Sequence, residues 1–411
     1  MWGGPVRKRD LGAIALLVFP GAAIAAACAT SENTAPSNEL DPVILEAGSS
    51  ETPDAADAAD ADAGHRRPDL VDAGTCSASG LCVVNAPVDT QINVTSIRGS
   101  GPNDVWAVGT NRTVVHYDGK VWEKAAPLTD EVTPFTMRAV WLDGPSDVWI
   151  GAGSILYHST GWNGPSGTAW SSATFIDGTS VNAIAGMNGN VLLARQVNND
   201  FWTTFPALMT CRGWMNDNLV DLEEVATPMF DAEGADGLWS LAMTRPDEAW
   251  ATSLGSDDRP GARVVRIHRA SSDAGDPVGD GASWQVEEYD SRTSRNLYGV
   301  WGNEQVVWVV GEGGTLRRMT PAKLSSRAFE TVASPVTADL RGIYGFGPDD
   351  VWAVGDDATV VHYDGKVWSR LATPLDGVNV KPRLFAVWGS SPKDVWIGGN
   401  GVMLHFEGDA P

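Results

Sequence analysis

The nine residues VVHYDGKVW occur twice in the chain, at positions 114–122 and 360–368, and each copy follows a DVWAVG segment. His, Tyr, Asp and Trp are residue types that build active sites. An almost intact duplication is also what a repeated structural unit leaves in a sequence. Aligning the chain on the DVW position extends the repeat to six anchor tryptophans: Trp106, Trp149, Trp250, Trp308, Trp352 and Trp396.

Neighbouring anchors are 43 to 58 residues apart, except that 101 residues separate Trp149 from Trp250. A degenerate unit, VNAIAGMNGNVLLARQ near Val191, fits this gap and brings the number of units to seven. Each unit alternates short apolar segments with Pro-Asx and Asp-Gly turn signals, which predicts four antiparallel strands. Seven such units predict an all-β fold, a single seven-bladed β-propeller.

The two ends of the repeat region complement each other. The last unit stops after its third strand, at LHFEGDAP, whereas LCVVNAPV (81–88) precedes the first unit. LCVVNAPV aligns with the fourth strands VWEKAAPL and VWSRLATPL if Cys82 takes the position of Trp. We therefore expect this N-terminal segment to close the last blade, with Cys76 and Cys82 as candidates for a disulfide that holds it.

Residues 1–27 carry the features of an export signal. Positive charge at Arg7, Lys8 and Arg9 precedes an apolar run that ends in AAAC at Cys28. This pattern resembles the bacterial lipoprotein signal, which implies acylation of Cys28, and Ala29 resembles the residue found in lipoproteins sent to the outer membrane. The alternative is ordinary cleavage after Ala27. We expect the exported protein to be lipid-anchored at the outer membrane or cell surface.

Residues 28–75 predict a disordered acidic tether. Eleven acidic residues and two arginines give this segment a net charge of −9, and it contains no aromatic residue. Such a segment cannot bury enough apolar surface to fold. The propeller domain is accordingly expected at 76–411. The whole chain carries a net charge of −23, which argues against nucleic acid as a partner and leaves the lipid anchor as the only expected contact with a membrane.

The repeats resemble the bacterial propellers grouped with BNR, YVTN and WD-type repeats, especially those of myxobacterial surface lipoproteins. The resemblance covers residues 79–411 and rests on the DVWAVG and HYDGxxW motifs. It implies the architecture and little about function. The Asp-box of sialidases is matched only in part, because YDGKVW keeps Asp-Gly and Trp without the Ser and Thr.

The repeat accounts for most residues of catalytic type. The aspartates that precede Val-Trp recur at a turn and are expected to cap it. Four histidines fall on the third strands of four different units, too far apart to share a metal ion: His116, His158, His362 and His405. No nucleophile elbow, phosphate-binding loop or zinc motif is present in the sequence. We therefore expect no catalytic residue, metal or cofactor.

One position varies while its surroundings stay regular. Across the seven units it holds Thr95, Arg138, Asn182, Trp239, Tyr298, Arg341 and Phe385. It lies near the start of the innermost strand, where the central channel of a propeller opens. We take Arg138, Trp239, Tyr298, Arg341 and Phe385 as the candidate ligand-binding residues, suited to a sugar or an anionic group. The alternative is ordinary packing between blades.

The expected function is that of a non-catalytic cell-envelope lipoprotein whose propeller, as a monomer, serves as a binding or scaffold module for a protein or carbohydrate ligand. Two alternatives stay open: a sialidase- or glycosidase-like enzyme, and a purely structural envelope component. A second irregular stretch, 198–225, carries Trp202, Cys211 and Trp214 where the other units have regular hairpins.

Overall fold

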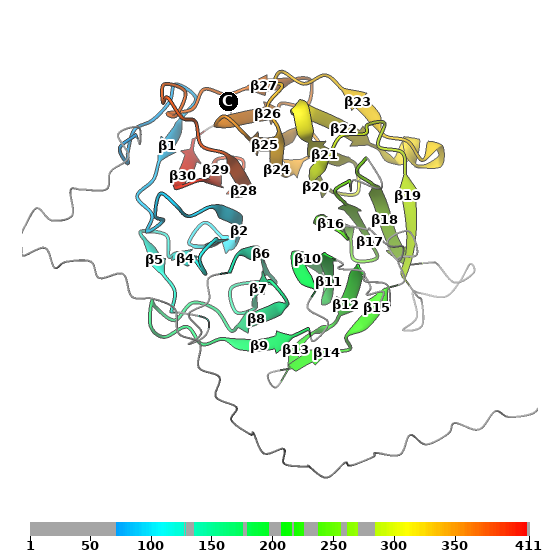
Figure 1. The fold of residues 1–411 in the computed structure, drawn as a ribbon, viewed down its shortest axis with the longest axis horizontal. Helices are drawn as coiled ribbons and strands as arrows, with labels where there is room; N and C mark the ends of the chain where they lie inside the picture. The colour runs from blue at the N-terminus through cyan, green and yellow to red at the C-terminus, as the bar shows by residue number, and fades with distance from the viewer. Residues whose placement is uncertain are drawn as a thin grey trace, which may run out of the picture. The chain divides into compact units, whose positions relative to one another are not determined.

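The computed structural model describes residues 71–126, 128, 135–175, 179–196, 207–215, 218–225, 237–255, 261–269 and 284–408. The expected signal segment, Cys28, most of the tether and Trp202 lie outside these ranges. The described residues form seven four-stranded antiparallel sheets around a central axis (Figure 1). This arrangement confirms the seven-bladed β-propeller. No helix among the described residues is long and apolar enough to span a membrane.

We number the blades 1 to 7 in chain order and give the strands of each from the axis outward. Blade 1 contains β2 (Val94–Gly101), β3 (Asp104–Gly109), β4 (Val114–Tyr117) and β5 (Trp122–Lys124). Blade 2 contains β6 (Met137–Leu142), β7 (Val148–Ala152), β8 (Ile155–Ser159) and β9 (Ser171–Thr174). Blade 3 contains β10 (Ser180–Met187), β11 (Asn190–Gln196), β12 (Leu208–Cys211) and β15 (Glu223–Val225). A separate hairpin precedes β15 and consists of β13 (Gly213–Met215) and β14 (Asn218–Val220).

Blade 4 contains β16 (Ser240–Arg245), β17 (Glu248–Thr252), β18 (Val264–Arg269) and β19 (Trp284–Tyr289). Blade 5 contains β20 (Leu297–Gly302), β21 (Val307–Gly311), β22 (Thr315–Met319) and β23 (Glu330–Val332), with the short 3-10 helices η2 (Glu312–Gly314) and η3 (Pro321–Ser326) between strands. Blade 6 contains β24 (Leu340–Gly347), β25 (Asp350–Gly355), β26 (Thr359–Tyr363) and β27 (Trp368–Arg370). Blade 7 contains β28 (Leu384–Ser391), β29 (Asp394–Gly399), β30 (Val402–Glu407) and, from the other end of the chain, β1 (Leu81–Val83).

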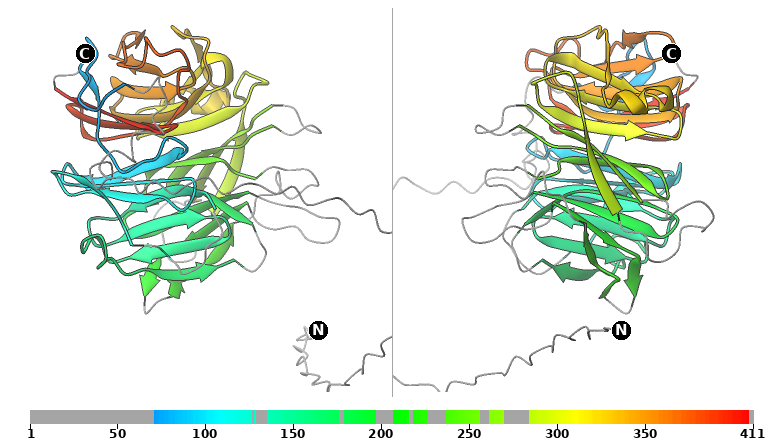
Figure 2. Two further views of the ribbon diagram at one scale, coloured as in Figure 1. Left: turned by 60° about the vertical axis from the view of Figure 1, so that its left-hand side comes forward. Right: turned by 90° about the vertical axis from the view of Figure 1, so that its right-hand side faces the viewer.

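The N-terminal strand β1 closes blade 7 by pairing with β30, as the sequence predicts, and the side views show the two ends of the propeller meeting there (Figure 2). The expected register is wrong by one residue. Leu81 lies opposite Phe406, as Trp122 lies opposite Tyr117 in blade 1, so Leu81 and not Cys82 takes the tryptophan position. Successive side chains of a strand point to opposite faces, and the fully buried Leu81 fills the slot between blades.

Cys82 is thereby placed where it can reach the chain that precedes β1. It forms a disulfide with Cys76. The Gly74 N–H donates to the Val83 carbonyl, and the Val83 N–H donates to the Thr75 carbonyl. Residues just before the expected domain start at 76 are thus hydrogen-bonded to β1.

Aromatic side chains of the two quoted repeats join their blades to a neighbouring blade. Trp122, the last residue of the quoted repeat, meets Trp396 of blade 7 edge to face, with ring centroids 5.1 Å apart. In the second copy Trp368 meets Trp308 of blade 5 in the same way, at 5.2 Å. Edge-to-face aromatic pairs add to the energy of area burial. The tryptophans of the repeat therefore contribute to these interfaces between blades.

The aspartates before Val-Trp do more than cap a turn. The Asp104 Oδ1 atom accepts hydrogen bonds from Trp106 Nε1 at 3.0 Å and pairs with His116 Nε2 at 2.8 Å. Asp147 and Asp350 hold the corresponding Trp and His of blades 2 and 6. The expectation of a simple turn cap was incomplete because the network joins two strands. Each His is bound within its own blade, and no three potential metal ligands gather among the described residues.

Candidate ligand-binding site

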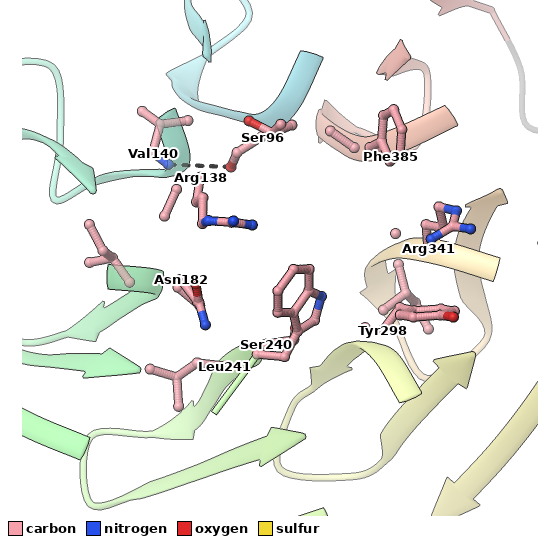
Figure 3. A pocket seen from close by; sticks show the side chains of 18 of the residues that line it. Ser96, Arg138, Val140, Asn182, Ser240, Leu241, Tyr298, Arg341 and Phe385 are labelled. Atoms are coloured by element: carbon pink, nitrogen blue, oxygen red, sulfur yellow. Dashed lines mark hydrogen bonds between the residues drawn. The ribbon is translucent and has the colours of Figure 1, made fainter. Parts of the chain in front are cut away.

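A cavity of about 540 Å³ lies at the propeller axis and is lined by the innermost strand of every blade. All seven residues of the variable position border it. We call them the ring residues: Thr95, Arg138, Asn182, Trp239, Tyr298, Arg341 and Phe385. Figure 3 shows labelled ring residues from blades 2, 3, 5, 6 and 7 around the same space. A cavity of this volume is in the range that holds a small molecule or a short peptide segment.

A β-bulge places six of the seven ring residues. In blade 2 Met137 pairs with Ala152 and Ala139 pairs with Gly151, so Arg138 between them has no partner across the ladder. The same shift in register occurs around Thr95, Asn182, Tyr298, Arg341 and Phe385. Trp239 immediately precedes β16. A bulge bends its strand and changes the direction of the extra side chain.

In blades 1, 5, 6 and 7 a glycine lies opposite the start of this bulge, whereas blades 2 and 3 have Ala152 and Arg195 there and keep the bulge. A Cβ atom at Gly355 would lie 1.8 Å from the Asp339 carbonyl oxygen, two residues before Arg341. A Cβ at Gly311 would lie 2.0 Å from the Asn296 carbonyl oxygen, two residues before Tyr298. Both distances are far too short for any other residue type. In these four blades the glycine accommodates a close approach of the bulged inner strand to the next strand.

Two ring residues contribute hydrogen bonds between blades. Thr95 Oγ1 donates to the Met137 carbonyl at 2.5 Å, and Asn182 Nδ2 donates to the Leu238 carbonyl at 2.9 Å. Ser96, next to Thr95, accepts from the Val140 N–H at 3.3 Å (Figure 3). For Thr95 and Asn182, packing between blades therefore accounts for much of what the side chains do.

Arg341 belongs to a neutralised cluster on one side of the ring. Its guanidinium donates two hydrogen bonds to Asp356 and lies 3.4 Å from Asp339. It also lies over the Tyr298 ring, 4.8 Å from the centroid, and 5.9 Å from the Phe385 centroid. The hydrogen bonds from Arg341 to Asp356 raise the pKa of this guanidinium. Its charge is therefore compensated within the protein.

Arg138 is different. Its guanidinium lies over the Trp239 ring, 5.3 Å from the centroid, which joins blades 2 and 4 across the cavity. Within the described ranges it has no hydrogen bond and no carboxylate partner. Burial lowers the pKa of Arg138, because removing a cation from water disfavours its charged form. The donors of this side chain are available to a ligand.

A third arginine at the cavity was not predicted from the sequence. Arg98 lines the cavity, donates to the Ile97 carbonyl at 2.8 Å and lies 5.7 Å from the Tyr344 ring centroid. Burial lowers its pKa as well. Its position in the repeat, three residues after the ring position, holds Trp141, Trp301, Tyr344 and Trp388 in other blades. A cation in an aromatic slot was the signal that could have identified it.

The described residues that line the cavity include Arg98, Arg138 and Arg341 but no Asp, Glu, His, Lys or Cys. Glycoside hydrolysis requires two carboxylates that flank the bond to be cleaved. This part of the lining supplies neither a general acid nor a general base of that kind. It offers hydrogen-bond donors, positive charge and aromatic faces.

The remaining candidates lie away from the axis. The Cys76–Cys82 disulfide is beside the outermost strand of blade 7. Cys211 is buried on β12, and burial raises the pKa of its thiol to about 11. Trp214, on the β13–β14 hairpin, packs edge to face on Trp149 of blade 2 at 5.6 Å. Trp214 therefore makes the same kind of contact between blades as Trp122 and Trp368, but from a hairpin that is separate from the four-stranded sheet.

No protein-family model and no curated protein sequence matches the chain. Many solved structures share its fold. The structure described as "YCF48 bound to D1 peptide" has a TM-score of 0.57 at 18% identity and covers 83% of this chain and 97% of its own. Streptogramin B lyase has a TM-score of 0.56 at 13% identity, with coverage of 80% and 99%. The WD40 propeller of Doa1 has a TM-score of 0.53 at 12% identity, with coverage of 80% and 96%.

At these identities the comparisons show the fold alone. Together with the sheet topology they establish a seven-bladed β-propeller with an axial cavity. The three similar proteins have different descriptions: one is solved with a peptide, one is a lyase and one is a WD40 domain. Because one fold hosts many functions, the function has to be argued from the cavity.

Proposed function

We propose that the chain is a non-catalytic binding module of the cell envelope that holds a segment of a partner protein at the mouth of its axial cavity. One observation carries the proposal. The position that varies within the repeat is the position that the β-bulges place at the cavity, in all but one of the blades. The scaffold residues are alike from blade to blade, whereas the residues at the cavity differ. This is expected where the cavity recognises a specific ligand.

A peptide segment is the ligand class we favour over a glycan. The fold is shared with a propeller solved with a peptide, YCF48 with D1 peptide. The lining combines hydroxyl and amide groups with guanidinium donors and aromatic rings, which suits side chains and carbonyl groups of an extended segment. A glycan could also stack on Trp239 or Tyr298 and is retained as an outcome of the test below.

The enzymatic alternative is less well supported. A glycosidase requires paired carboxylates, and none of the described lining residues is acidic. A purely structural component would have no use for an arginine such as Arg138, whose burial carries a desolvation cost that no described carboxylate offsets. A binding module accounts for this arginine, because the ligand supplies the missing partner.

The location is part of the same proposal. A lipid on Cys28 would attach the protein to the membrane, and the acidic segment 29–75 would separate the propeller from the surface. A monomeric propeller on such a tether can reach partners at the envelope without inserting into it.

The proposal is tested by site-specific photo-cross-linking in cells that produce the protein. A photoreactive phenylalanine analogue replaces Phe385 in one variant and Tyr298 in another. Controls carry it at Val367 and Val380, which are 55% and 72% exposed and do not line the cavity. We expect a discrete adduct with one partner from the two ring positions and none from the controls. Equal adducts at all four positions, or adducts only at the controls, would show that the cavity is not the binding site.

A further inference from the structure

The lining of the cavity is positively charged, although the chain as a whole is negatively charged. The chain carries a net charge of −23, yet the described cavity lining contains three arginines and no acidic residue. Asp356 neutralises Arg341. The two guanidinium groups of Arg98 and Arg138 are left without a carboxylate partner among the described residues.

An uncompensated and partly desolvated cation is unfavourable for folding. Arg138 nevertheless stays at the cavity, held over Trp239 at 5.3 Å. Stacking on an aromatic ring orients a guanidinium and leaves the N–H groups at its edge free to donate. That edge matches the two oxygens of a carboxylate, in a bidentate pair stronger than a bond between neutral groups.

The number and kind of cationic side chains at the cavity limit the class of anion that can bind there. The described lining holds only two uncompensated guanidinium groups and no lysine. The surrounding protein is strongly acidic, so a polyanion such as nucleic acid or a sulfated polysaccharide would be repelled over most of its length. A short segment with one or two carboxylates avoids this repulsion and fits the cavity volume of about 540 Å³.

We propose that the group recognised in the cavity is a carboxylate of a short acidic peptide, bound by Arg138 above the Trp239 ring and attracted in addition by Arg98. The apolar side chain next to that carboxylate packs against the aromatic ring residues. This inference rests on the proposed function, because it names the chemistry of the segment that the binding module holds. The carboxylate comes from a side chain or from the C-terminus of the partner.

The test uses four synthetic pools of random N-acetylated hexapeptides. Two pools draw on Asp, Glu, Phe, Leu, Val and Ala, once with a free C-terminus and once amidated. Two matched pools replace Asp and Glu with Asn and Gln. Each pool is passed over immobilised full-length protein, and retained peptides are quantified by mass spectrometry. Acidic oligogalacturonides are passed over the same material as a glycan probe.

Two variants decide which residue is responsible. Arg138→Gln removes one positive charge at the cavity. Lys323→Gln removes one charge from η3, where the Lys323 amine is exposed near Glu330. We expect at least one pool that carries a carboxylate to be retained at least about tenfold above the neutral amidated pool, which carries none. Arg138→Gln should abolish this excess and Lys323→Gln should preserve it. Preference for the acidic amidated pool over its neutral partner identifies a side-chain carboxylate, and preference for free over amidated neutral peptides identifies a C-terminal one.

A charge exchange guards against loss of binding by misfolding. Arg138→Glu should lose acidic peptides and retain pools in which Lys replaces Asp and Glu. Equal retention of all four pools, unaffected by Arg138→Gln, would overturn the carboxylate inference and leave the peptide-binding function standing. Retention of the oligogalacturonides without any peptide would overturn both in favour of a glycan ligand. No retention of any probe would also overturn both.

Discussion

Arg341 donates two hydrogen bonds to the carboxylate of Asp356 at the edge of the axial cavity. Arg138 occupies the equivalent position of another blade and has no such partner within the described ranges. The same bulge thus holds two arginines in opposite electrostatic states. One is part of the scaffold, and the other has its hydrogen-bonding capacity available.

The two arginines are expected to respond oppositely to loss of charge. Arg341→Gln leaves Asp356 without its main partner and should destabilise the protein by about 1–3 kcal/mol. Arg138→Gln removes a desolvated, unpaired cation and should leave stability unchanged or slightly higher. Urea unfolding followed by tryptophan fluorescence measures both. An equal loss of stability in the two variants would mean that Arg138 has a structural partner after all.

Acid is expected to weaken the network of Asp104, His116 and Trp106. Burial alone would raise the pKa of Asp104, but hydrogen bonds from His116, Ser100 and Trp106 together lower it below the ordinary value. A carboxyl group with a lowered pKa in the folded state stabilises the fold above its unfolded-state pKa, about 3.9. That contribution is lost as the pH falls below about 4, through the folded-state pKa.

The variant Asp104→Asn isolates this contribution. It should be less stable than wild type at neutral pH and should lose less further stability between pH 5 and pH 2.5. The matched control Glu304→Gln changes an exposed carboxylate in a turn of blade 5 and should follow the wild-type curve. Parallel acid profiles for wild type and Asp104→Asn would contradict the assigned role of this aspartate.

The register of the closing strand makes Leu81 the critical residue of β1. Leu81→Ala removes a fully buried side chain between blades and should cost about 2–5 kcal/mol. The double variant Cys76→Ser/Cys82→Ser should cost about 2 kcal/mol, through loss of a disulfide that closes a short loop. Under reducing conditions the penalty of the double variant should shrink and that of Leu81→Ala should persist. A Leu81→Ala protein as stable as wild type would refute this register.

The sequence was sufficient to predict the architecture because the same four-stranded pattern recurs in seven units. The DVW anchors, the turn signals and the missing fourth strand of the last unit together predict the number of blades and the closure by β1. The register of β1 was not predictable in the same way. Its sequence, LCVVNAPV, has no tryptophan to align, and the face that each residue occupies is decided by burial against blade 6.

A break in the repeat indicated the position of the candidate site. It did not indicate which charged residues of the site have a partner. All seven ring residues border the cavity, but nothing in the sequence distinguishes Arg138 from Arg341. Asp356 lies fifteen residues from Arg341 and reaches it only because β24 and β25 pair. Similarly, the partnership of Asp104 with His116 depends on the pairing of β3 with β4. Contacts of this kind require the strand register.

The lipid anchor is tested separately from the propeller. Cys28→Ala should release the protein from membranes into the soluble fraction and abolish incorporation of labelled palmitate, because Cys28 would carry the acyl chains. The Cys211→Ala variant is the control and should remain membrane-bound. Membrane association of Cys28→Ala at the wild-type level would reject the lipoprotein assignment in favour of another mode of retention.

We propose above that the axial cavity binds a partner segment through Arg138. Native mass spectrometry of the protein released gently from its own membranes measures this directly. We expect an adduct of peptide or protein mass on wild type, retained by Lys323→Gln and absent from Arg138→Gln. An adduct of the same mass and occupancy on Arg138→Gln would contradict the account, because the partner would then be held elsewhere on the propeller.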